Sequence, residues 1–371
     1  MALGKSAVED LEMKLFSGCY HGKKVLITGH TGFKGSWLAY WLSELGAEII
    51  GVALPPATCP NLWDLLRLNM VDHRIDIRDG ALLSRLVADT QPEIVFHLAA
   101  QPLVRRSYRN PLETWTTNVM GTVNLLEACR ESRSVRAIVV VTTDKVYENR
   151  ESSLAYHENE KLGGHDPYSA SKAASELVAA SYRKSYFNAE HMPLLATARA
   201  GNAVGGGDWS EDRLIPDLVR ATVSGALLEI RSPEATRPWQ HVLECLSGYL
   251  LLGQMLLEGR SECAAAWNFG PGQESNISVS TMLTCLSNYW PEAAWRTSFQ
   301  AQPHEAGLLS LDSSKAQTEL GWRPVWNLDE TLRVTADWYQ AYIAEGRLEH
   351  RAQLAAYVNT ARLAGLAWSG L

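Results

Sequence analysis

The sequence predicts an α/β fold in which a doubly wound parallel sheet carries a second, smaller domain of mixed α/β structure. Three observations support this prediction. Short apolar runs alternate with amphipathic stretches from Lys24 onward, which is typical of parallel strands covered by helices on both faces. A glycine-rich turn follows the first run. The alternation fades after about residue 200, too early for the eight units of a TIM barrel.

The expected strands are six apolar, β-rich runs. They cover residues 24–28, 48–52, 73–77, 93–99, 136–142 and 194–200. Three helices are expected over residues 36–45, 111–132 and 168–185. The first places tryptophan and leucine side chains on one face and stops at Gly46, a residue type that favours helix ends. Residues 241–257 indicate a further buried strand-to-helix stretch.

These elements divide the chain into two expected domains. The dinucleotide-binding domain covers residues 22–199, and residues 237–268 return to it. The substrate-binding domain covers residues 200–236 and 269–345, where elements are shorter and prolines and tryptophans are frequent. Residues 1–21 and 346–371 are terminal extensions. Residues 1–12 precede a second methionine and are left out of the fold prediction.

Composition and charge exclude several classes of protein. Of the 371 residues, 46% are hydrophobic and 20% charged, so the chain can build a large core and is not intrinsically disordered. The formal net charge of −7 provides no electrostatic footprint for nucleic acid. The longest apolar stretch, residues 248–257, is far shorter than the roughly 20 residues of a membrane helix.

The N-terminus and the cysteines indicate the compartment. Glu9, Asp10 and Glu12 lie where a signal peptide would need an apolar run. The six cysteines are widely scattered and have neither CxxC pairs nor histidines at zinc spacing. We therefore expect a cytoplasmic protein with reduced thiols, mostly in the core, and no metal site.

The turn GHTGFKG at residues 29–35 predicts a dinucleotide site in a Rossmann-type fold. Its glycines permit a tight turn and a close approach of the backbone to a pyrophosphate, and the helix N-terminus supplies free N–H groups. The expected cofactor-binding residues of this turn are Gly29, Thr31, Gly32, Phe33, Lys34 and Gly35. An ordinary glycine-rich turn is the alternative.

The sequence does not distinguish sharply between NAD and NADP as the cofactor. Residues 51–54, at the end of the second strand, include neither the acidic residue that accepts the ribose hydroxyls of NAD nor an arginine for a 2′-phosphate. NAD is expected, and Lys34 leaves NADP open as the alternative. Asp76 is placed to bind the adenine amino group, or else to cap the following helix.

A catalytic group is indicated by Tyr168 and Lys172, which lie one turn apart on a helical face. A positive charge there would lower the pKa of the phenol, which could then act as a general base. Thr143 and Asp144 end a strand at the carboxyl edge of the sheet, where folds of this kind bind ligands.

Together these motifs resemble the extended short-chain dehydrogenase/reductases, and among them the nucleotide-sugar 4,6-dehydratases. The broad resemblance rests on residues 29–35, HLAAQ at 97–101, NVMGT at 118–122, TD at 143–144 and YSASK at 168–172. The narrower one, to the branch that acts on CDP-glucose, rests on TDKVY at 143–147, AGNAVGGGDW at 200–209, DRLIP at 212–216, RPWQH at 237–241 and PHEA at 303–306.

The resemblance implies a closed redox cycle on CDP-glucose. Tyr168 would remove the C4 hydroxyl proton, aided by Thr143, while hydride passes from C4 to NAD. Lys172 would orient the ribose. Asp144 would protonate the hydroxyl that leaves C6, provided that burial keeps the carboxyl group protonated. Hydride returning to C6 would yield CDP-4-keto-6-deoxyglucose.

One residue departs from the pattern of most 4,6-dehydratases, which have glutamate as the C5 base where this chain has Lys145. A lysine can act as the base only if it is desolvated or crowded by another cation. Otherwise it stabilises the developing enolate, and this role is slightly favoured. The alternative is a surface lysine.

The resemblance also implies further binding residues. For the cofactor these are Ile77, Leu98, Ala99, Ala100, Gln101, Asn118 and Thr142, beside Asp76, Tyr168 and Lys172. For the nucleotide sugar they are Asn202, Arg213, Leu214, Arg231, Arg237 and His304. Arg213 and Arg237 are expected to clamp the diphosphate, and Arg231 to meet the base; helix capping or solvation are the alternatives for Arg213 and Arg231.

Two alternative functions stay open, and the resemblance also implies an oligomeric state. A nucleotide-sugar 4-epimerase would use the same threonine, tyrosine and lysine but would not need the Asp144–Lys145 pair. A non-catalytic dinucleotide-binding scaffold is disfavoured by the intact catalytic residues. The resemblance implies a homodimer through helices 111–132 and 168–185, with a tetramer as the alternative.

Overall fold

The computed structural model describes residues 15–152, 154–298 and 307–370. Its centre is a seven-stranded sheet in the order β11-β6-β5-β4-β1-β2-β3, in which every neighbouring pair is parallel. The strands are β1 (Lys24–Thr28), β2 (Glu48–Val52), β3 (Val71–His73), β4 (Ile94–His97), β5 (Ala137–Val141), β6 (Leu194–Ala200) and β11 (Ala266–Phe269). The predicted Rossmann-type α/β fold is confirmed.

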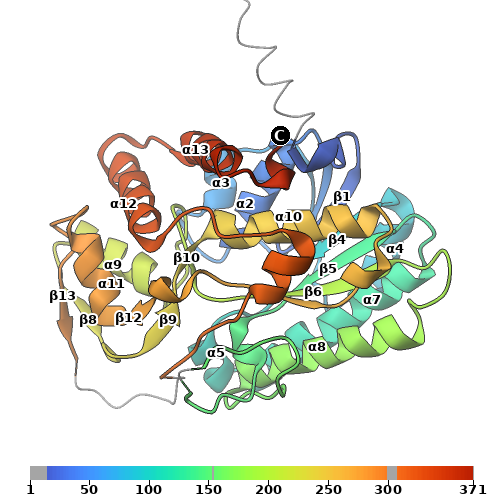
Figure 1. Cartoon of the computed structure of the whole chain (residues 1–371), viewed down its shortest axis with the longest axis horizontal. Helices are drawn as coiled ribbons and strands as arrows, with labels where there is room; N and C mark the ends of the chain where they lie inside the picture. The colour runs from blue at the N-terminus through green and yellow to red at the C-terminus, as the bar shows by residue number, and fades with distance from the viewer. Residues whose placement is uncertain (1–14, 153, 299–306, 371) are drawn as a thin grey trace, which may run out of the picture.

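Helices cover both faces of this sheet (Figure 1). One face carries α4 (Gly80–Thr90), α7 (Gly121–Glu131) and α8 (Pro167–Ser185). The other carries α2 (Phe33–Glu44) and α10 (Val242–Leu257). Every residue of α10 is buried. Because β1, β4 and β5 are also almost wholly buried, they are apolar on both sides.

A smaller group of elements lies beside the sheet, on the left of Figure 1. It includes α9 (Leu214–Val223), α11 (Val279–Ser287) and two pairs of strands, β8 (Leu228–Ile230) with β13 (Trp295–Thr297) and β9 (Thr236–Pro238) with β12 (Asn276–Ser278). A third pair joins β7 (Ala203–Val204) to β10 (Gln240–His241). The predicted domain bounds stay predictions. Residues 237–268 are expected to return to the dinucleotide-binding domain, and β11, at the end of this segment, lies at the edge of the large sheet.

The C-terminal helices α12 (Leu328–Glu345) and α13 (His350–Leu363) pack on the α2 face. Trp368, beyond α13, stacks on Phe16 with ring centroids 5.1 Å apart. At the start of α10, Glu244 accepts hydrogen bonds from the backbone N–H groups of Val325 and Trp326 and from the Tyr357 hydroxyl. A single buried carboxylate thus joins α10 to the C-terminal helices.

Two predicted elements differ most from the structure, whereas the helix predicted at residues 36–45 begins earlier, at Phe33, and the strand predicted at 93–99 is shorter, Ile94–His97. The third strand is Val71–His73, not residues 73–77, because its partner β2 ends at Val52, opposite His73, and leaves nothing beyond to pair with. The predicted helix 111–132 is α6 (Pro111–Trp115), a π-helical turn η2 (Thr116–Met120) and α7 in direct succession. A single π turn is a bulge within one helix, often found at functional sites.

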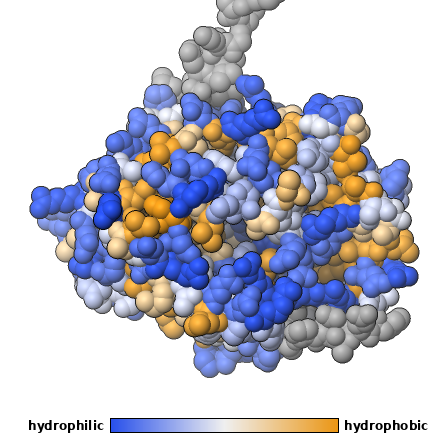
Figure 2. Space-filling view, turned by 180° about the vertical axis from the view of Figure 1, so that it is seen from behind, coloured by the Kyte–Doolittle hydropathy of each residue, from blue (hydrophilic) through white to orange (hydrophobic). Residues whose placement is uncertain are grey.

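The surface and the cysteines have the following features in the described part of the chain. Apolar residues on the face shown in Figure 2 are interspersed with hydrophilic ones. No helix among the described residues is long and apolar enough to cross a membrane. All six cysteines are free thiols; three are buried, Cys19 and Cys285 are half-buried, and Cys59 is exposed.

Candidate active site

The glycine turn between β1 and α2 has the geometry of an anion cradle. Gly29 has φ +79°, and a Cβ there would lie 2.6 Å from the backbone nitrogen of Ala99. A Cβ on Gly35 would lie 2.1 Å from the Gly29 carbonyl oxygen. Gly32 is the N-cap of α2 and has no side chain to occupy the first N–H groups of the helix. The turn therefore fits the pyrophosphate of a dinucleotide.

The carboxyl end of β2 carries charged groups that the sequence analysis did not find. Arg74, just beyond β3, donates to the Leu54 carbonyl oxygen at 3.3 Å and pairs with Asp72 at 2.6 Å. Thr31 donates to the same carbonyl oxygen at 3.0 Å. Only the pairing of β3 with β2 brings this arginine and this carboxylate to the ribose end of the site, so no local motif could have indicated them.

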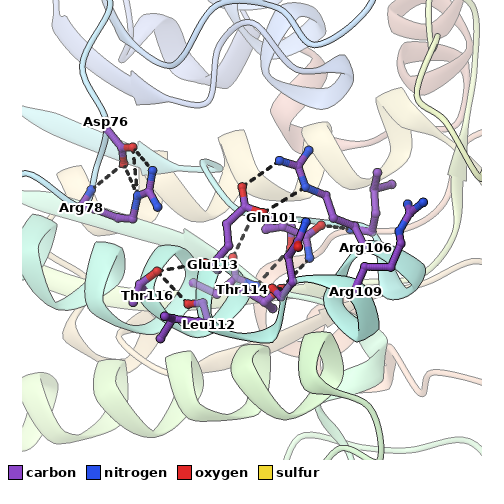
Figure 3. Close-up of polar contacts among 12 residues, drawn as sticks. Asp76, Arg78, Gln101, Arg106, Arg109, Leu112, Glu113, Thr114 and Thr116 are labelled. Atoms are coloured by element: carbon purple, nitrogen blue, oxygen red, sulfur yellow. Dashed lines mark hydrogen bonds and ion pairs between the residues drawn. The ribbon is translucent and has the colours of Figure 1, made fainter.

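Asp76 lies three residues beyond β3 and not at its end as expected. Its carboxylate accepts hydrogen bonds from the Arg78 guanidinium and backbone N–H (Figure 3). The Arg78 hydrogen bond holds the pKa of Asp76 below its usual value. Asp79, not Asp76, caps α4 through a hydrogen bond from Leu82 N–H. The capping alternative for Asp76 is therefore wrong.

The strand-end loop 98–101 is held by Asn118. The Asn118 side chain accepts from the Gln101 N–H at 2.8 Å and donates to the Gln101 carbonyl oxygen and to Ser171. The Gln101 side chain in turn donates to Thr114 (Figure 3). Ile77 is buried and would meet any Cβ on Gly121. Asn118 therefore fixes the loop between the sheet and α8, and its amide is fully engaged within the protein.

Tyr168, Thr143, Asp144 and Lys145 line one cleft of about 310 Å³ at the carboxyl edge of the sheet. Thr143 caps the short turn η3 (Asp144–Val146), and its side chain lies next to the Tyr168 phenol, whose pKa it lowers. The strand end and the start of α8 therefore meet in one pocket, as the motifs indicated. Lys34 lies at the same cleft.

The electrostatics of the tyrosine and lysine differ from the simple expectation. Burial raises the pKa of Tyr168 to about 12, against the opposing effects of Thr143 and the Arg213 guanidinium. Burial also lowers the pKa of Lys172 to about 8, and its ammonium donates to the Val141 carbonyl oxygen at 3.0 Å. The predicted lowering of the phenol pKa by Lys172 is wrong: the pKa is raised, because desolvation penalises the charged form, and the cation that opposes this effect is Arg213.

Asp144 and Lys145 form a pair inside the cleft. Asp144 Oδ1 accepts from the Thr143 hydroxyl at 2.8 Å and lies 3.4 Å from Lys145 Nζ. Asp144 Oδ2 is buried and has no hydrogen-bond partner among the residues described. Lys145 Nζ also contacts Asn202 Oδ1 at 3.5 Å, and only 14% of its side chain is exposed. The surface alternative for Lys145 is wrong.

The opposite wall of the cleft carries the predicted sugar-binding residues. Asn202, Arg213, Leu214, Arg231 and Arg237 all line it. Arg213 precedes α9 without capping it through its side chain and pairs with Asp208 at 3.4 Å, so its capping alternative is wrong.

The remaining arginines of this wall differ in their surroundings. Arg237 is buried and donates to the carbonyl oxygens of Thr236 and Gly307, whereas Arg231 is exposed. His304 lies outside the described residues. Arg105, which the sequence analysis did not single out, also lines the cleft and pairs with Asp212 across it at 3.2 Å.

Fold and site together define the class: an α/β protein with a dinucleotide cradle and a tyrosine–threonine–lysine group at the strand ends. The sequence model of the GDP-mannose 4,6 dehydratase family matches residues 26–335. The chain belongs to this family.

Individual relatives agree with this assignment. The CDP-glucose 4,6-dehydratase of Salmonella typhimurium is 49% identical over 331 residues, which cover 87% of this chain and 92% of the relative. A dTDP-glucose 4,6-dehydratase of Xanthomonas campestris is 29% identical, with 85% and 92% covered. The solved structure of a dTDP-glucose 4,6-dehydratase from Streptomyces venezuelae, with NAD bound, is similar at a TM-score of 0.75 and 27% identity, with 85% and 97% covered.

Proposed function

We propose that the protein is a hydro-lyase that converts CDP-glucose to CDP-4-keto-6-deoxyglucose in deoxysugar biosynthesis. The observation that carries the proposal is the meeting of Tyr168, Thr143 and the Asp144–Lys145 pair in one cleft beside the glycine cradle. The 49% identity to a CDP-glucose 4,6-dehydratase supports the choice of reaction and of nucleotide.

The chain's own residues suit successive proton transfers. When bound, a nicotinamide dinucleotide supplies a hydride acceptor for C4 and a hydride donor for C6. Tyr168 takes the proton of the C4 hydroxyl in its phenolate form, which the positive charge of a bound, oxidised nicotinamide would favour against the effect of burial. Thr143 holds that hydroxyl in place. Asp144, whose Oδ2 has no partner in the described part of the chain, donates the proton with which the C6 hydroxyl leaves as water.

Lys145 places a cation beside the enolate that forms when C5 loses its proton to the Asp144 carboxylate, which then passes that proton to the departing C6 hydroxyl. Its contact with Asp144 favours this role over that of the C5 base. Lys145→Met, followed with solvent isotope at C5 and C6, tests whether Lys145 acts at the elimination step in either role. Stabilisation of the enolate predicts slower elimination and slower C5 exchange; a full elimination rate with unchanged C5 exchange would rule out both.

For the cofactor we favour NAD over NADP. A 2′-phosphate needs a free arginine, and Arg74 is already neutralised by Asp72 at 2.6 Å. The glycine cradle and the Asp76–Ile77 segment fit either dinucleotide. Calorimetric titration with NAD and with NADP tests this choice directly, and tighter binding of NADP would contradict it.

A homodimer is proposed through the helices of the α7–α8 face, with a tetramer as the alternative. Large apolar side chains are exposed there on α6, η2 and α8, namely Leu112 at 77%, Trp115 at 40%, Met120 at 49% and Leu177 at 61%. Figure 1 shows α7 and α8 running side by side. Sedimentation of the wild type and of Leu177→Glu tests this assembly. The six free thiols support a cytoplasmic location.

The decisive experiment is a panel of CDP-, dTDP-, GDP- and UDP-hexoses with NAD and NADP, scored for a keto sugar that absorbs in strong alkali. Conversion of CDP-glucose with loss of the C6 hydroxyl supports the proposal. A product epimerised at C4 that keeps the C6 hydroxyl would instead identify a 4-epimerase. Binding without turnover of any sugar would indicate a non-catalytic scaffold.

A further inference from the structure

A buried carboxylate lies beneath the catalytic group. Glu176 follows Lys172 by one turn of α8, and 3% of its surface is exposed. It accepts hydrogen bonds from the Thr142 hydroxyl at 2.5 Å, the Thr197 hydroxyl at 2.7 Å and the Arg199 guanidinium at 2.8 Å. An unpaired charge in the protein interior is very costly. The Glu176 carboxylate must therefore stay within hydrogen-bond distance of these three partners, and this fixes the position of its side chain.

The partners of Glu176 belong to the strands that carry the site. Thr142 directly precedes Thr143, so its hydrogen bond ties the end of β5 to α8. Arg199, on β6, donates from its other nitrogen to the Tyr147 hydroxyl at 2.9 Å. Tyr147 follows η3, and its own hydroxyl donates to Asn268 of β11. Because Tyr147 directly follows the Asp144–Lys145 turn, the ion pair of Glu176 and Arg199 helps to hold that turn in place.

Glu176 is also the acidic group that acts most on Lys172. Its charge favours the ammonium form, whereas burial and Lys34 of α2 oppose it. His97 of β4 adds no charge, because burial and Lys172 hold its pKa at about 3. Charges on the other elements packed on α8 are also paired: Asp144–Lys145 of η3, Arg106–Glu113 of α5 and α6, and Glu127–Arg130 of α7. Arg105 and Arg109 of α5 both pair with Asp212. Arg199 of β6 is paired with Glu176 itself.

We propose that Glu176 is a positioning residue for the proposed dehydration. It holds the Thr143 strand end against the helix of Tyr168, and it keeps Lys172 protonated in a site that burial would otherwise neutralise. The inference rests on the proposed function for its substrate, but not for the coupling between Glu176 and Lys172.

The test is the pH profile of kcat/KM for Glu176→Gln, assayed with whichever nucleotide sugar of the panel the wild type converts. Without the carboxylate, Lys172 loses its proton at lower pH, so the alkaline limb is expected to move down by about one pH unit. The pH dependence of NAD affinity, measured by calorimetry, should move in the same direction. This second readout needs no substrate, so a wrong substrate and a wrong role for Glu176 give different results.

Two variants separate charge from structure. Thr197→Val removes one hydrogen bond to the same carboxylate but keeps its charge, so it should lower the melting temperature and leave the alkaline limb unchanged. Glu176→Asp keeps the charge and should restore the wild-type limb. An unshifted limb in Glu176→Gln, or an equal shift in Thr197→Val, would overturn the proposal.

A third variant guards against failure of Glu176→Gln to fold. Glu176→Gln/Arg199→Met removes both members of the buried pair, and such replacements are often tolerated. Because Glu176 is the counter-charge of Lys172, the alkaline limb should still move down in this double variant. A limb at the wild-type pH would contradict the role assigned to Glu176.

Discussion

The two walls of the cleft are built differently. On the sheet wall, Tyr168, Lys172 and Thr143 are buried, and each is fixed by contacts to strand ends or to α8. On the opposite wall, the Arg213 side chain is 33% exposed and Arg231 is exposed, on elements held by two-stranded sheets. The comparison teaches that the proposed proton-transfer groups are preorganised by burial, whereas Arg213 and Arg231 on the opposite wall keep access to solvent. Arg237, on that same wall, is buried.

The largest effect should come from the sheet wall. Tyr168→Phe removes the proposed base for the C4 hydroxyl proton, and we expect kcat to fall about a thousandfold, with little change in nucleotide-sugar affinity. Steady-state kinetics and calorimetry measure the two quantities. Tyr186→Phe, at the exposed end of the same helix, is the matched control and should behave as the wild type. If Tyr168→Phe lowered the affinity as much as kcat, Tyr168 would bind the nucleotide sugar, and the proposed difference between the two walls would be wrong.

A smaller loss is expected one step later in the reaction. Asp144→Asn cannot donate the proton that releases water, so turnover should fall about a hundredfold. Oxidation at C4 should still occur, and reduced cofactor should therefore accumulate in a single-turnover experiment followed by absorbance. If no reduced cofactor appeared, Asp144 would act at the first step, and the assignment of the two proton transfers would be wrong.

Substitutions on the wall opposite the sheet should change KM. Arg213→Met removes a charged hydrogen-bond donor from the diphosphate, and we expect KM to rise about tenfold with kcat nearly unchanged. Arg347→Met, which removes an exposed arginine remote from the cleft, is the control. A fall in kcat with constant KM would place Arg213 with the sheet wall instead.

A prediction about stability, with no expected effect on activity, concerns the junction between α10 and the C-terminal helices. Burial raises the pKa of Glu244 to about 7, so the folded protein holds a proton that the unfolded chain releases near pH 4.5. This contribution to stability is present below pH 4.5 and is lost as pH rises through 7. The free energy of unfolding of the wild type should therefore fall relative to Glu244→Gln by about 3 kcal/mol as the pH rises from below 4.5 to above 7. A constant difference in denaturation experiments would contradict the buried, protonated state.

Much of the fold was predictable because its signals are local. The strands β1, β2 and β6 begin and end where the apolar runs do, and α8 differs from its prediction by one residue. The third strand was wrong because its length depends on where β2 ends. The site divides in the same way: the glycine turn, Thr143 and Tyr168 belong to short motifs, whereas Arg74, Arg105 and Glu176 are functional candidates only through their neighbours.

The sequence by itself determined the alternation of strands and helices, the glycine turn and the chemical types at the strand ends, because each depends on residues that are close together in the chain. Only the tertiary structure decided which charges are paired and which groups are desolvated. Arg74 meets Asp72, and Glu176 meets Arg199, through strand pairing and helix packing. Burial, which raises the pKa of Tyr168 and lowers that of Lys172, depends on the whole core around them.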